Sequence, residues 1–320
     1  MTIEVLDSFP VEIDALAETG ARATFYHTRV WLESLAVAYP RMRPRCALAR
    51  DGGTVRGFLP FFESPRGPLR SVWSLPFGTY GGPVGDGDGV EHALLDVFDA
   101  ELRRPGTLEA GWVDFHNRST GATGTVETAT THVLDLRGGF DTVWRERFDK
   151  PRRRRVRRAE EKGVEVRRAG GEADIHGFLQ VYRQRLDAWD SGEGHPERLF
   201  HDLVARGGDG RVRMFVAVHA GEVVGGHLNL YHGRSVIAWY GMASAAGDEL
   251  NAGTLLYAHC IRDACDGGYE DYNLGASLGK ESLIAYKESL GGVARHYRII
   301  RRRRLAGRVA GALRNLRKQR

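Results

Sequence analysis

The chain is poor in the residues that build disulfides, membrane spans and export signals. Its 320 residues include three scattered cysteines, Cys46, Cys260 and Cys265, and so few thiols favour a reducing compartment over a disulfide framework. No apolar run approaches the roughly 18 residues of a membrane-spanning helix. The N-terminus lacks the basic and apolar regions of a signal peptide. We therefore expect a cytoplasmic globular protein.

Motifs for several kinds of catalysis are also missing. The sequence has no His-Glu-x-x-His and no paired Cys-x-x-Cys, so we expect no metal. It has no Gly-x-Ser-x-Gly and no Cys-His signature, which argues against a covalent intermediate. It has no Gly-x-x-x-x-Gly-Lys-Ser/Thr loop, which argues against an ATP-dependent ligase. No cofactor is expected beyond a co-substrate that carries the transferred group.

Positive charge, by contrast, is concentrated in two runs. Residues 295–320 hold ten arginines, one lysine and no acid, and the rest of the chain has 35 basic against 41 acidic residues. The second run, 150–158, includes Arg152, Arg153, Arg154 and Arg155. Such runs are either solvated helix faces or contacts to a polyanion such as tRNA, a diphosphate or anionic lipid. Aromatic residues do not alternate with the arginines, so stacking on single-stranded bases is not indicated.

An internal repeat divides the chain. Ala49–Gly57 matches Ala217–Gly225 at four positions with a constant offset of 168, and each copy is typical of a β-hairpin that closes on Val-x-Gly. A second echo relates Trp112–Phe115 to Tyr269–Tyr272 at an offset of 157. In both copies an apolar helix precedes that strand. Two echoes in the same order predict a duplicated domain.

The boundary between the copies is predicted near residues 138 and 139. A strand over 131–136 would start the second half, followed by a basic helix over 142–162 that Gly163 ends. The predicted organisation is a first domain over 1–138, a second over 139–298 and a basic tail over 299–320. Residues 307–317 of the tail have the composition of an amphipathic helix for an anionic bilayer.

The most informative segment is Tyr269–Gly292. A short strand ends in a glycine turn at Gly275, and a short helix follows with the pair Tyr286-Lys287 and then a diglycine. This resembles the closing motif of the Fem-type transferases. The resemblance implies two tandem domains of the N-acetyltransferase (GNAT) type, each a mixed α/β sheet with a splayed central strand pair. It also implies transfer of an aminoacyl group from charged tRNA to an amine.

The molecule that donates the acyl group is left open between aminoacyl-tRNA and acyl-CoA. GNAT enzymes that use coenzyme A hold its pyrophosphate on a Gln/Arg-x-x-Gly-x-Gly/Ala loop at a helix N-terminus. The matching segment here, 247–252, has Leu250 in place of the first glycine and Gly247 in place of the Arg or Gln. Asp248 and Glu249 add negative charge. This loop favours aminoacyl-tRNA over acyl-CoA as the donor.

Three residues are predicted to be catalytic. The resemblance places Lys287 near the reacting carbonyl, where a fixed cation would stabilise the oxyanion; the alternative is a surface lysine paired with a glutamate. Strand alternation puts Val236, Ala238 and Tyr240 on one face, and we expect Tyr240 and His227 to line one cleft. His227 is a candidate base, or a satisfied histidine of the sheet.

Other residues are predicted to bind substrates. Tyr286 would pack beside the acceptor, and Asn273 and Ser277 flank the turn glycine, where they would bond a substrate carbonyl. In the first half, the resemblance implies an acceptor side that includes Tyr80, Trp31 and Asp114. The functions left open are an aminoacyl-tRNA transferase acting on a cell-wall precursor or small amine, an acyl-CoA N-acyltransferase of polysaccharide or natural-product modification, and a non-catalytic tandem GNAT module.

Overall fold

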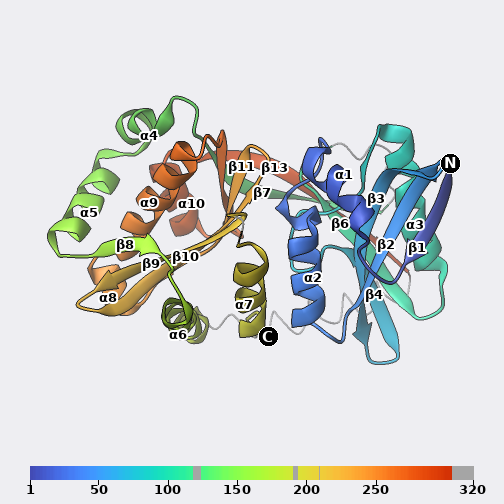
Figure 1. Ribbon diagram of the computed structural model, residues 1–320, viewed down its shortest axis with the longest axis horizontal. Helices are drawn as coiled ribbons and strands as arrows, with labels where there is room; N and C mark the ends of the chain where they lie inside the picture. The colour runs from blue at the N-terminus through green and yellow to red at the C-terminus, as the bar shows by residue number, and fades with distance from the viewer. Residues whose placement is uncertain (118–123, 190–193, 209, 305–320) are drawn as a thin grey trace. The chain divides into compact units, whose positions relative to one another are not determined.

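The computed structural model describes residues 1–117, 124–189, 194–208 and 210–304. The chain forms two units, one of residues 1–129 and 296–320 and the other of residues 130–295. Each unit is a mixed sheet with helices on both faces (Figure 1). Among the described residues, no helix combines the length and the apolar character needed to cross a bilayer.

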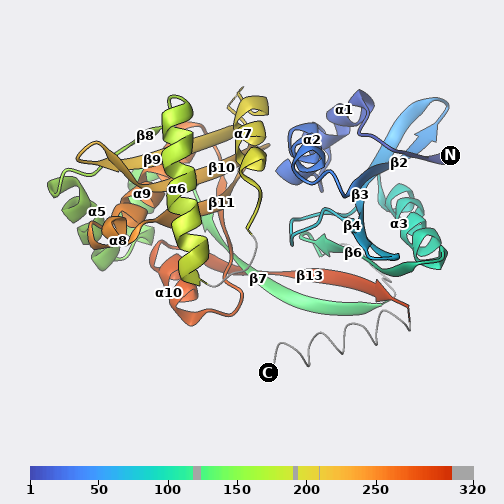
Figure 2. The same ribbon diagram turned by 90° about the horizontal axis from the view of Figure 1, so that it is seen from below.

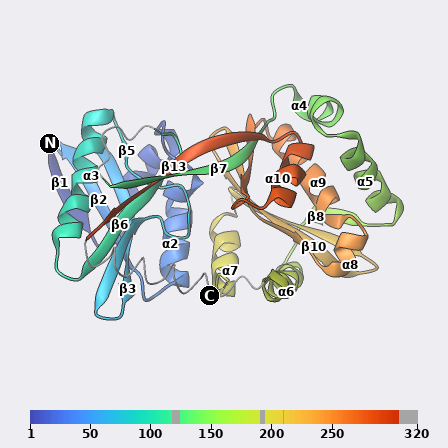
Figure 3. The same cartoon turned by 180° about the vertical axis from the view of Figure 1, so that it is seen from behind.

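The first unit is built on six hydrogen-bonded strands. Their order is β1 (Thr2–Leu6), β2 (Arg43–Asp51), β3 (Thr54–Arg66), β4 (Leu69–Ser74), β6 (Thr107–Asp114) and β13 (Val293–Arg303), with the short β5 (Val84–Gly85) beside β3. Helix α3 (Asp88–Arg103) covers one face, and α1 (Asp14–Thr19) and α2 (Arg29–Ala38) lie on the other (Figure 2; Figure 3 shows α2 and α3 from behind). The 3₁₀ turns Val11–Ile13 and Phe25–His27 precede α1 and α2.

The second unit repeats this plan. Its strand order is β8 (Glu165–Arg168), β9 (Val212–His219), β10 (Glu222–His232), β11 (Ser235–Ala243), β12 (Asp271–Ala276) and β7 (Thr125–Asp135). Helices α5 (Lys150–Glu161), α9 (Ala252–Asp266) and α10 (Glu281–Ser289) lie on one face, and α6 (Glu172–Trp189) and α7 (Glu197–Arg206) on the other (Figures 1 and 2). The short helices are α4 (Gly139–Thr142), a π-helical turn (Val143–Arg147) and α8 (Ala245–Glu249).

The predicted duplication is confirmed strand by strand. In both units three antiparallel pairings are followed by one parallel pairing, β4 with β6 and β11 with β12, and by a final antiparallel strand. The hairpin echo extends to a β-bulge, because the register shifts next to Gly57 in one copy and next to Gly225 in the other.

The two glycines of the hairpin echo have a common reason. A Cβ on Gly57 would lie 2.7 Å from a methyl of Val90 on α3, and one on Gly225 would lie 3.0 Å from a methyl of Leu256 on α9. The strand can approach its covering helix this closely only without a side chain. The Val-x-Gly pattern therefore marks the contact between strand and helix in each copy.

Residues 299–303, which we predicted to be part of the basic tail, belong to a strand instead. They form the end of β13, which pairs antiparallel with β6 from Arg298 opposite Asp114 to Arg303 opposite Glu109. Thus the last strand of the first unit comes from the far end of the chain. Residues 305–320, with the predicted amphipathic helix over 307–317, lie outside the described residues.

Two further expectations are corrected. The second sequence match aligns Asp114 with Asp271, but Asp114 ends β6 whereas Asp271 begins β12. The two strands are equivalent in the fold, but the aligned residues do not occupy equivalent positions in them. The single helix expected over 142–162 is interrupted at Phe148. Asp149 caps the N-terminus of α5 by accepting a hydrogen bond from the Arg152 amide at 2.6 Å, with a proline in the first turn, and this starts a new helix.

Candidate functional site

A cavity of about 580 Å³ opens in the second unit where two parallel strands separate. The ladder between β11 and β12 has three residue pairs and ends at Ile237 opposite Asn273, while β11 continues to Ala243. This is the splayed pair that the GNAT resemblance implies. The cavity is lined from β10 and β11, from the N-terminus of α9, and from α5, α6 and α10 by Arg152, Arg155, Arg185, His227, Gly241, Met242, Ala243, Asp248, Asn251, Gly253, Thr254, Leu256, Tyr257, Ser282, Leu283 and Tyr286.

One end of the cavity is cationic. Arg152 and Arg155, one helical turn apart on α5, line this cavity together with Asn251 and Gly253 at the N-terminus of α9. The Arg152 guanidinium lies 4.2 Å from the ring centre of Tyr286, and its Nε donates to Ser289 Oγ at 2.6 Å. Burial, and then the charge of Arg155, lower the pKa of Arg152. Two guanidinium groups and a helix N-terminus that line one cavity are suited to anions such as phosphates.

Basic residues far away in the sequence contact the acidic loop 247–252. Arg185 of α6 forms an ion pair with Asp248 and donates to the Ala243 carbonyl oxygen. Lys162 Nζ donates to the Glu249 carbonyl oxygen at 2.8 Å. Asp248 therefore does not present an uncompensated charge to the cavity, contrary to what the loop's sequence indicates.

The other end of the cavity is neutral and is built around His227. This side chain is fully buried, and its ring packs edge-on against Tyr257 with 4.5 Å between the ring centres. A Cβ on Gly241, the strand partner of His227, would lie 2.6 Å from the imidazole, so the glycine makes room for the ring. Neither ring nitrogen has a hydrogen-bond partner within the described residues. Burial lowers the pKa of His227 to about 3, and the Asn229 side chain offsets this only in part.

The Tyr286-Lys287 pair of α10 divides between the cavity and the sheet. Tyr286 lines the cavity, half-buried, and its hydroxyl bonds Thr254. Lys287 is not among the lining residues. It is buried against the end of β12, where Nζ donates to the carbonyl oxygens of Gly275 and Ala276 at 2.7 and 2.9 Å. Burial lowers its pKa from 10.5 to about 8.

The two polar residues beside the turn glycine also lie outside the cavity lining. Asn273 Oδ1 accepts from Thr131 Oγ1 at 2.6 Å and from the Gly275 amide at 2.9 Å. Ser277 is buried and its hydroxyl has no hydrogen-bond partner within the described residues. Asn273 and Lys287 thus fix the end of β12 in the direction in which it leaves β11.

We expected Tyr240 and His227 to line one cleft, but Tyr240 faces away from the cavity. Leu228 is the strand partner of Tyr240 and Gly241 that of His227, so the adjacent residues His227 and Leu228 place the two pairs on opposite faces. The cause is a bulge at Trp239, which breaks the alternation between Ala238 and Tyr240. Tyr240 instead packs in an aromatic cluster on the other face, with ring centres 5.3 Å from Tyr182 and 5.6 Å from Phe200.

The four arginines of the mid-chain run have three different surroundings. Arg152 and Arg155 line the cavity. Arg153 donates to the carbonyl oxygens of Trp144 and Arg145 at 2.9 and 3.0 Å, and so caps the π-helical turn. Arg154 is exposed. The run is therefore neither a uniform solvated face nor a uniform contact surface.

The first-half candidates are packed inside the first unit. Trp31 is fully buried, and its ring centre lies 4.9 Å from that of Tyr26. Tyr80 stacks on Phe115 with 4.1 Å between ring centres, and Asp114 pairs with Arg298 at 2.9 Å. The cavity beside Tyr80 and Asp114 measures about 10 Å³, which is at most the room for one water. These side chains pack against neighbours in this unit, and their role in binding an acceptor stays a prediction.

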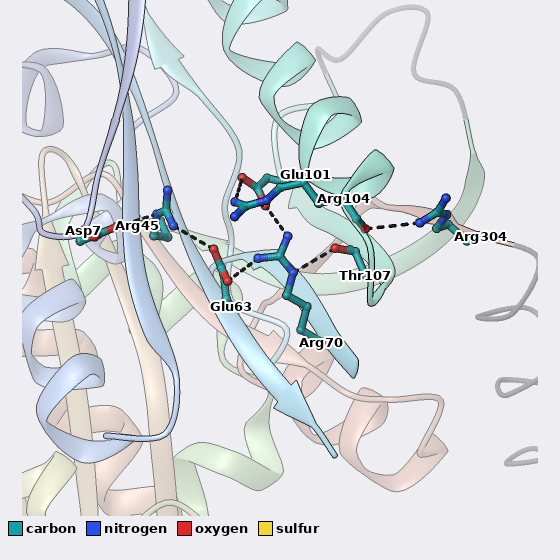
Figure 4. Close-up of polar contacts among 8 residues, drawn as sticks. All are labelled: Asp7, Arg45, Glu63, Arg70, Glu101, Arg104, Thr107 and Arg304. Atoms are coloured by element: carbon teal, nitrogen blue, oxygen red, sulfur yellow. Dashed lines mark hydrogen bonds and ion pairs between the residues drawn. The ribbon is translucent and has the colours of Figure 1, made fainter. Parts of the chain in front are cut away.

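A chain of ion pairs also crosses the first unit (Figure 4). Glu63 is buried between Arg45 and Arg70, and Arg70 continues to Glu101 at 2.8 Å and to Thr107 Oγ1 at 3.0 Å. Asp7 and Arg104 extend the chain of ion pairs at its ends, and Arg304 donates a hydrogen bond to the Arg104 carbonyl oxygen. Both oxygens of Glu63 are thus used, which is what a buried carboxylate requires for stability.

Much of the cavity lining was not predicted from the sequence, including Gly241, Thr254, Tyr257 and Arg185. A signal was available for two of them, because Thr254 and Tyr257 lie one helical turn apart directly after the 247–252 loop, at the start of α9. Among the described residues, no group of three or more His, Cys, Asp or Glu side chains could hold a metal ion. The three cysteines are free thiols, and burial raises the pKa of Cys46 to about 12.

Comparison with known proteins agrees with this geometry. Residues 147–288 match the acetyltransferase (GNAT) domain family. The fold is similar to FemX (TM-score 0.69, 13% identity, covering 93% of this chain and 97% of that one). It is also similar to L-PGS from Bacillus licheniformis (0.58, 14%, 98% of each chain) and to a tandem GNAT protein from the clavulanic acid biosynthesis pathway (0.56, 14%, 94% and 98%). A sequence search of curated proteins finds no match. The chain therefore has a tandem GNAT fold, and its resemblance to a Fem-type transferase is confirmed at the level of the fold.

Proposed function

We propose that this protein is an N-acyltransferase that takes an aminoacyl group from aminoacyl-tRNA and forms an amide bond on an amine acceptor. In this reaction the acceptor nitrogen attacks the ester carbonyl. The C–N bond forms, the C–O bond to the 3′ ribose breaks, and the proton of the amine ends on the released 3′ hydroxyl. The acceptor is a cell-wall precursor or a small amine.

The observation that carries this proposal is the position of the cavity. It begins where β11 and β12 separate, and its cationic end joins Arg152 and Arg155 to the N-terminus of α9. A donor with phosphates at one end and a reactive acyl group at the other fits this polarity, because anions are stabilised at a helix N-terminus and beside arginine. The fold shared with FemX and L-PGS supports tRNA as the carrier.

Lys287 acts in this scheme as a positioning residue. Its ammonium bonds the carbonyl oxygens of Gly275 and Ala276, which follow the last paired residue of β12. It thereby holds open the gap between the strands and adds a fixed positive charge beneath it. His227, with its pKa lowered to about 3 by burial, is too weak a base to deprotonate an ammonium at neutral pH. We assign it hydrogen bonding instead.

A second candidate donor is acyl-CoA. The same cationic end would hold a pyrophosphate, and Arg152 and Arg155 would supply the positive charge that the loop itself lacks. The tandem GNAT protein of the clavulanic acid pathway, whose solved form is described as being without AcCoA, shares the fold. Aminoacyl-tRNA remains the first proposal because Leu250 occupies the first glycine position of a coenzyme A loop and Gly247 the position of its Arg or Gln, although Ala252 fits the last position.

The test is transfer of radiolabelled amino acids from a pool of charged tRNAs to cell-wall precursors and simple amines. We expect transfer that RNase abolishes and that falls in Lys287→Ala. Transfer from acetyl-CoA or another acyl-CoA that survives RNase would replace the first proposal by the second. Absence of both, with the protein folded, would leave a non-catalytic module and refute the proposal.

A further inference from the structure

The buried polar groups at the neutral end of the cavity require a partner. His227 is 0% exposed, and neither ring nitrogen lies within hydrogen-bond distance of a partner among the described residues. The Asn229 side chain, two residues on, is near enough to oppose the effect of burial on the pKa of His227, but it does not line the cavity. Buried polar side chains in folded proteins are almost always hydrogen-bonded. Asn229 Oδ1 is engaged by the Tyr272 hydroxyl at 2.7 Å, so this part of the sheet is otherwise ordered. His227 lines the cavity, so a ligand bound there can complete it.

The orientation of His227 is fixed by its surroundings. The ring sits edge-on to Tyr257 at 4.5 Å, in the space that Gly241 leaves free. Tyr257 is itself 5.6 Å from Tyr286, whose ring lies under Arg152. These four side chains form one wall of the cavity, which runs from a neutral imidazole at one end to a guanidinium at the other. A ligand along this wall would have its anionic part at the Arg152 end.

The chemistry of the neutral end limits what His227 can bind. A neutral imidazole offers one N–H donor and one lone pair. A phosphate or carboxylate would be drawn to the arginine end instead, and burial keeps His227 uncharged. The lone pair is complemented by an N–H or O–H of the ligand. In aminoacyl-tRNA, the N–H or O–H group nearest the reacting carbonyl is the α-amino group.

We propose that His227 recognises the α-amino group of the transferred aminoacyl residue, so that the enzyme distinguishes aminoacyl from simple acyl donors. This inference rests on the proposed aminoacyl-tRNA donor. A site built to hydrogen-bond a substrate N–H discriminates strongly against an analogue that lacks it, because the buried protein group is then left without its partner. His227 is thus a specificity-determining residue of the donor site.

The test compares two donors on the same tRNA, one carrying alanine and the other propionate, which differ only in the α-amino group. We expect wild type to prefer the alanyl donor by at least ~100-fold in kcat/KM. His227→Phe preserves the ring and its contact with Tyr257 but removes both nitrogens, and we expect it to reduce the preference at least ~10-fold. The intrinsic reactivity of the two esters is the same in both enzymes, so the ratio of the two preferences isolates the role of His227.

His259→Phe is the matched control, because His259 lies on α9 and contacts Phe215 but does not line the cavity. It should keep the wild-type preference. An equal loss with both donors in His227→Phe would overturn the inference, and so would equal use of both donors by wild type. If wild type transfers neither group, the proposed function itself fails. Circular dichroism and thermal unfolding establish that each variant is folded.

Discussion

The two units use the same strand order but treat the parallel strand pair in opposite ways. In the second unit the ladder between β11 and β12 ends after three pairs, and a cavity of about 580 Å³ opens beyond it. In the first unit the ladder between β4 and β6 runs to Ser74 opposite Trp112. The chain then turns back, and the Gly81 amide donates to the Val113 carbonyl oxygen at 3.0 Å. The corresponding place in the first unit is therefore filled.

The residues that fill the first unit explain why it cannot open in the same way. A Cβ on Gly81 would lie 2.4 Å from the Ser74 carbonyl oxygen, so the returning chain is packed directly on β4. Ser74 Oγ donates to the Pro60 carbonyl oxygen and accepts from the Gly82 amide. Polar groups here are satisfied by the protein, whereas His227 in the second unit is not. Duplication has thus produced one closed unit and one with a candidate binding site.

The largest expected effect comes from removing the cationic end of the open unit. Arg152→Ala combined with Arg155→Ala removes two groups suited to phosphate contacts. Charge-assisted hydrogen bonds contribute about 1.5–3 kcal/mol each, so kcat/KM for the donor should fall at least ~100-fold. Steady-state transfer from charged tRNA measures this loss, and its dependence on salt should weaken as well.

Arg154 provides a control on the same helix. It is exposed and does not line the cavity, so Arg154→Ala should change kcat/KM by less than ~3-fold, within the range of an exposed surface charge. An equal loss in Arg154→Ala and in the double variant would mean that the run acts as a diffuse charged surface. That result would contradict the assignment of the donor to this cavity.

The closed unit should respond in stability and not in catalysis. Glu63→Ala leaves Arg45 and Arg70 without their shared carboxylate. Breaking a buried ion pair by removing one partner costs about 3–5 kcal/mol. We expect the free energy of unfolding in urea to fall by about 3 kcal/mol, while kcat per folded molecule is unchanged.

Asp51→Ala is the comparison for this variant. Asp51 is 71% exposed in its pair with the N-terminus at 3.8 Å, and such pairs contribute less than about 1 kcal/mol. A loss of stability in Glu63→Ala no larger than in Asp51→Ala would show that the ion chain of Figure 4 is not a stabilising feature.

A smaller effect concerns the pH dependence of the open unit. Burial lowers the pKa of Lys287 to about 8, so its ammonium is charged below that pH and loses its charge as the pH rises through it. If the charge holds the end of β12, the transfer rate should fall by ~10-fold between pH 7 and 9. Lys287→Arg, which stays charged, should lack this decline. The readout is the rate ratio of the two enzymes over that range.

The same group gives an independent check on stability. The folded state binds the Lys287 proton less tightly than the unfolded state, whose lysine has a pKa near 10.5. The unfolded state therefore carries more protons between about pH 8 and 10.5, and stability should rise with pH in that window relative to Lys287→Met. A flat difference between the two proteins would mean that Lys287 is solvated as an ordinary surface lysine.

The duplication followed from short local patterns in the sequence, and the splayed strand pair followed from the resemblance to the GNAT fold. The hairpin echo was reliable because Gly57 and Gly225 meet the same physical need, close contact with a covering helix. The bulge at Trp239 has no such local signal, and strand alternation therefore placed Tyr240 on the wrong face. The break at Phe148 did have a signal, since Asp149 and the proline after Lys150 are typical of a helix start.

The composition of the candidate site depended on long-range contacts. The arginines of 152–155 look alike in sequence, but the helical turn points Arg152 and Arg155 to the cavity and leaves Arg154 exposed. Arg185 balances Asp248 from 63 residues away, and β13 completes a unit whose other strands end at Asp114. Such pairings are set by tertiary structure, so no local pattern could have predicted them.

Hydrogen–deuterium exchange with a donor analogue tests the contrast between the units most directly. The probe is an acceptor-stem RNA with alanine joined to its 3′ end by a stable amide, and coenzyme A is examined in parallel. We predict that the RNA slows exchange in peptides covering 238–256 of the second unit and leaves 74–84 of the first unit unchanged. Slower exchange over 74–84 with no change over 238–256 would contradict the assignment of the donor site to the open unit.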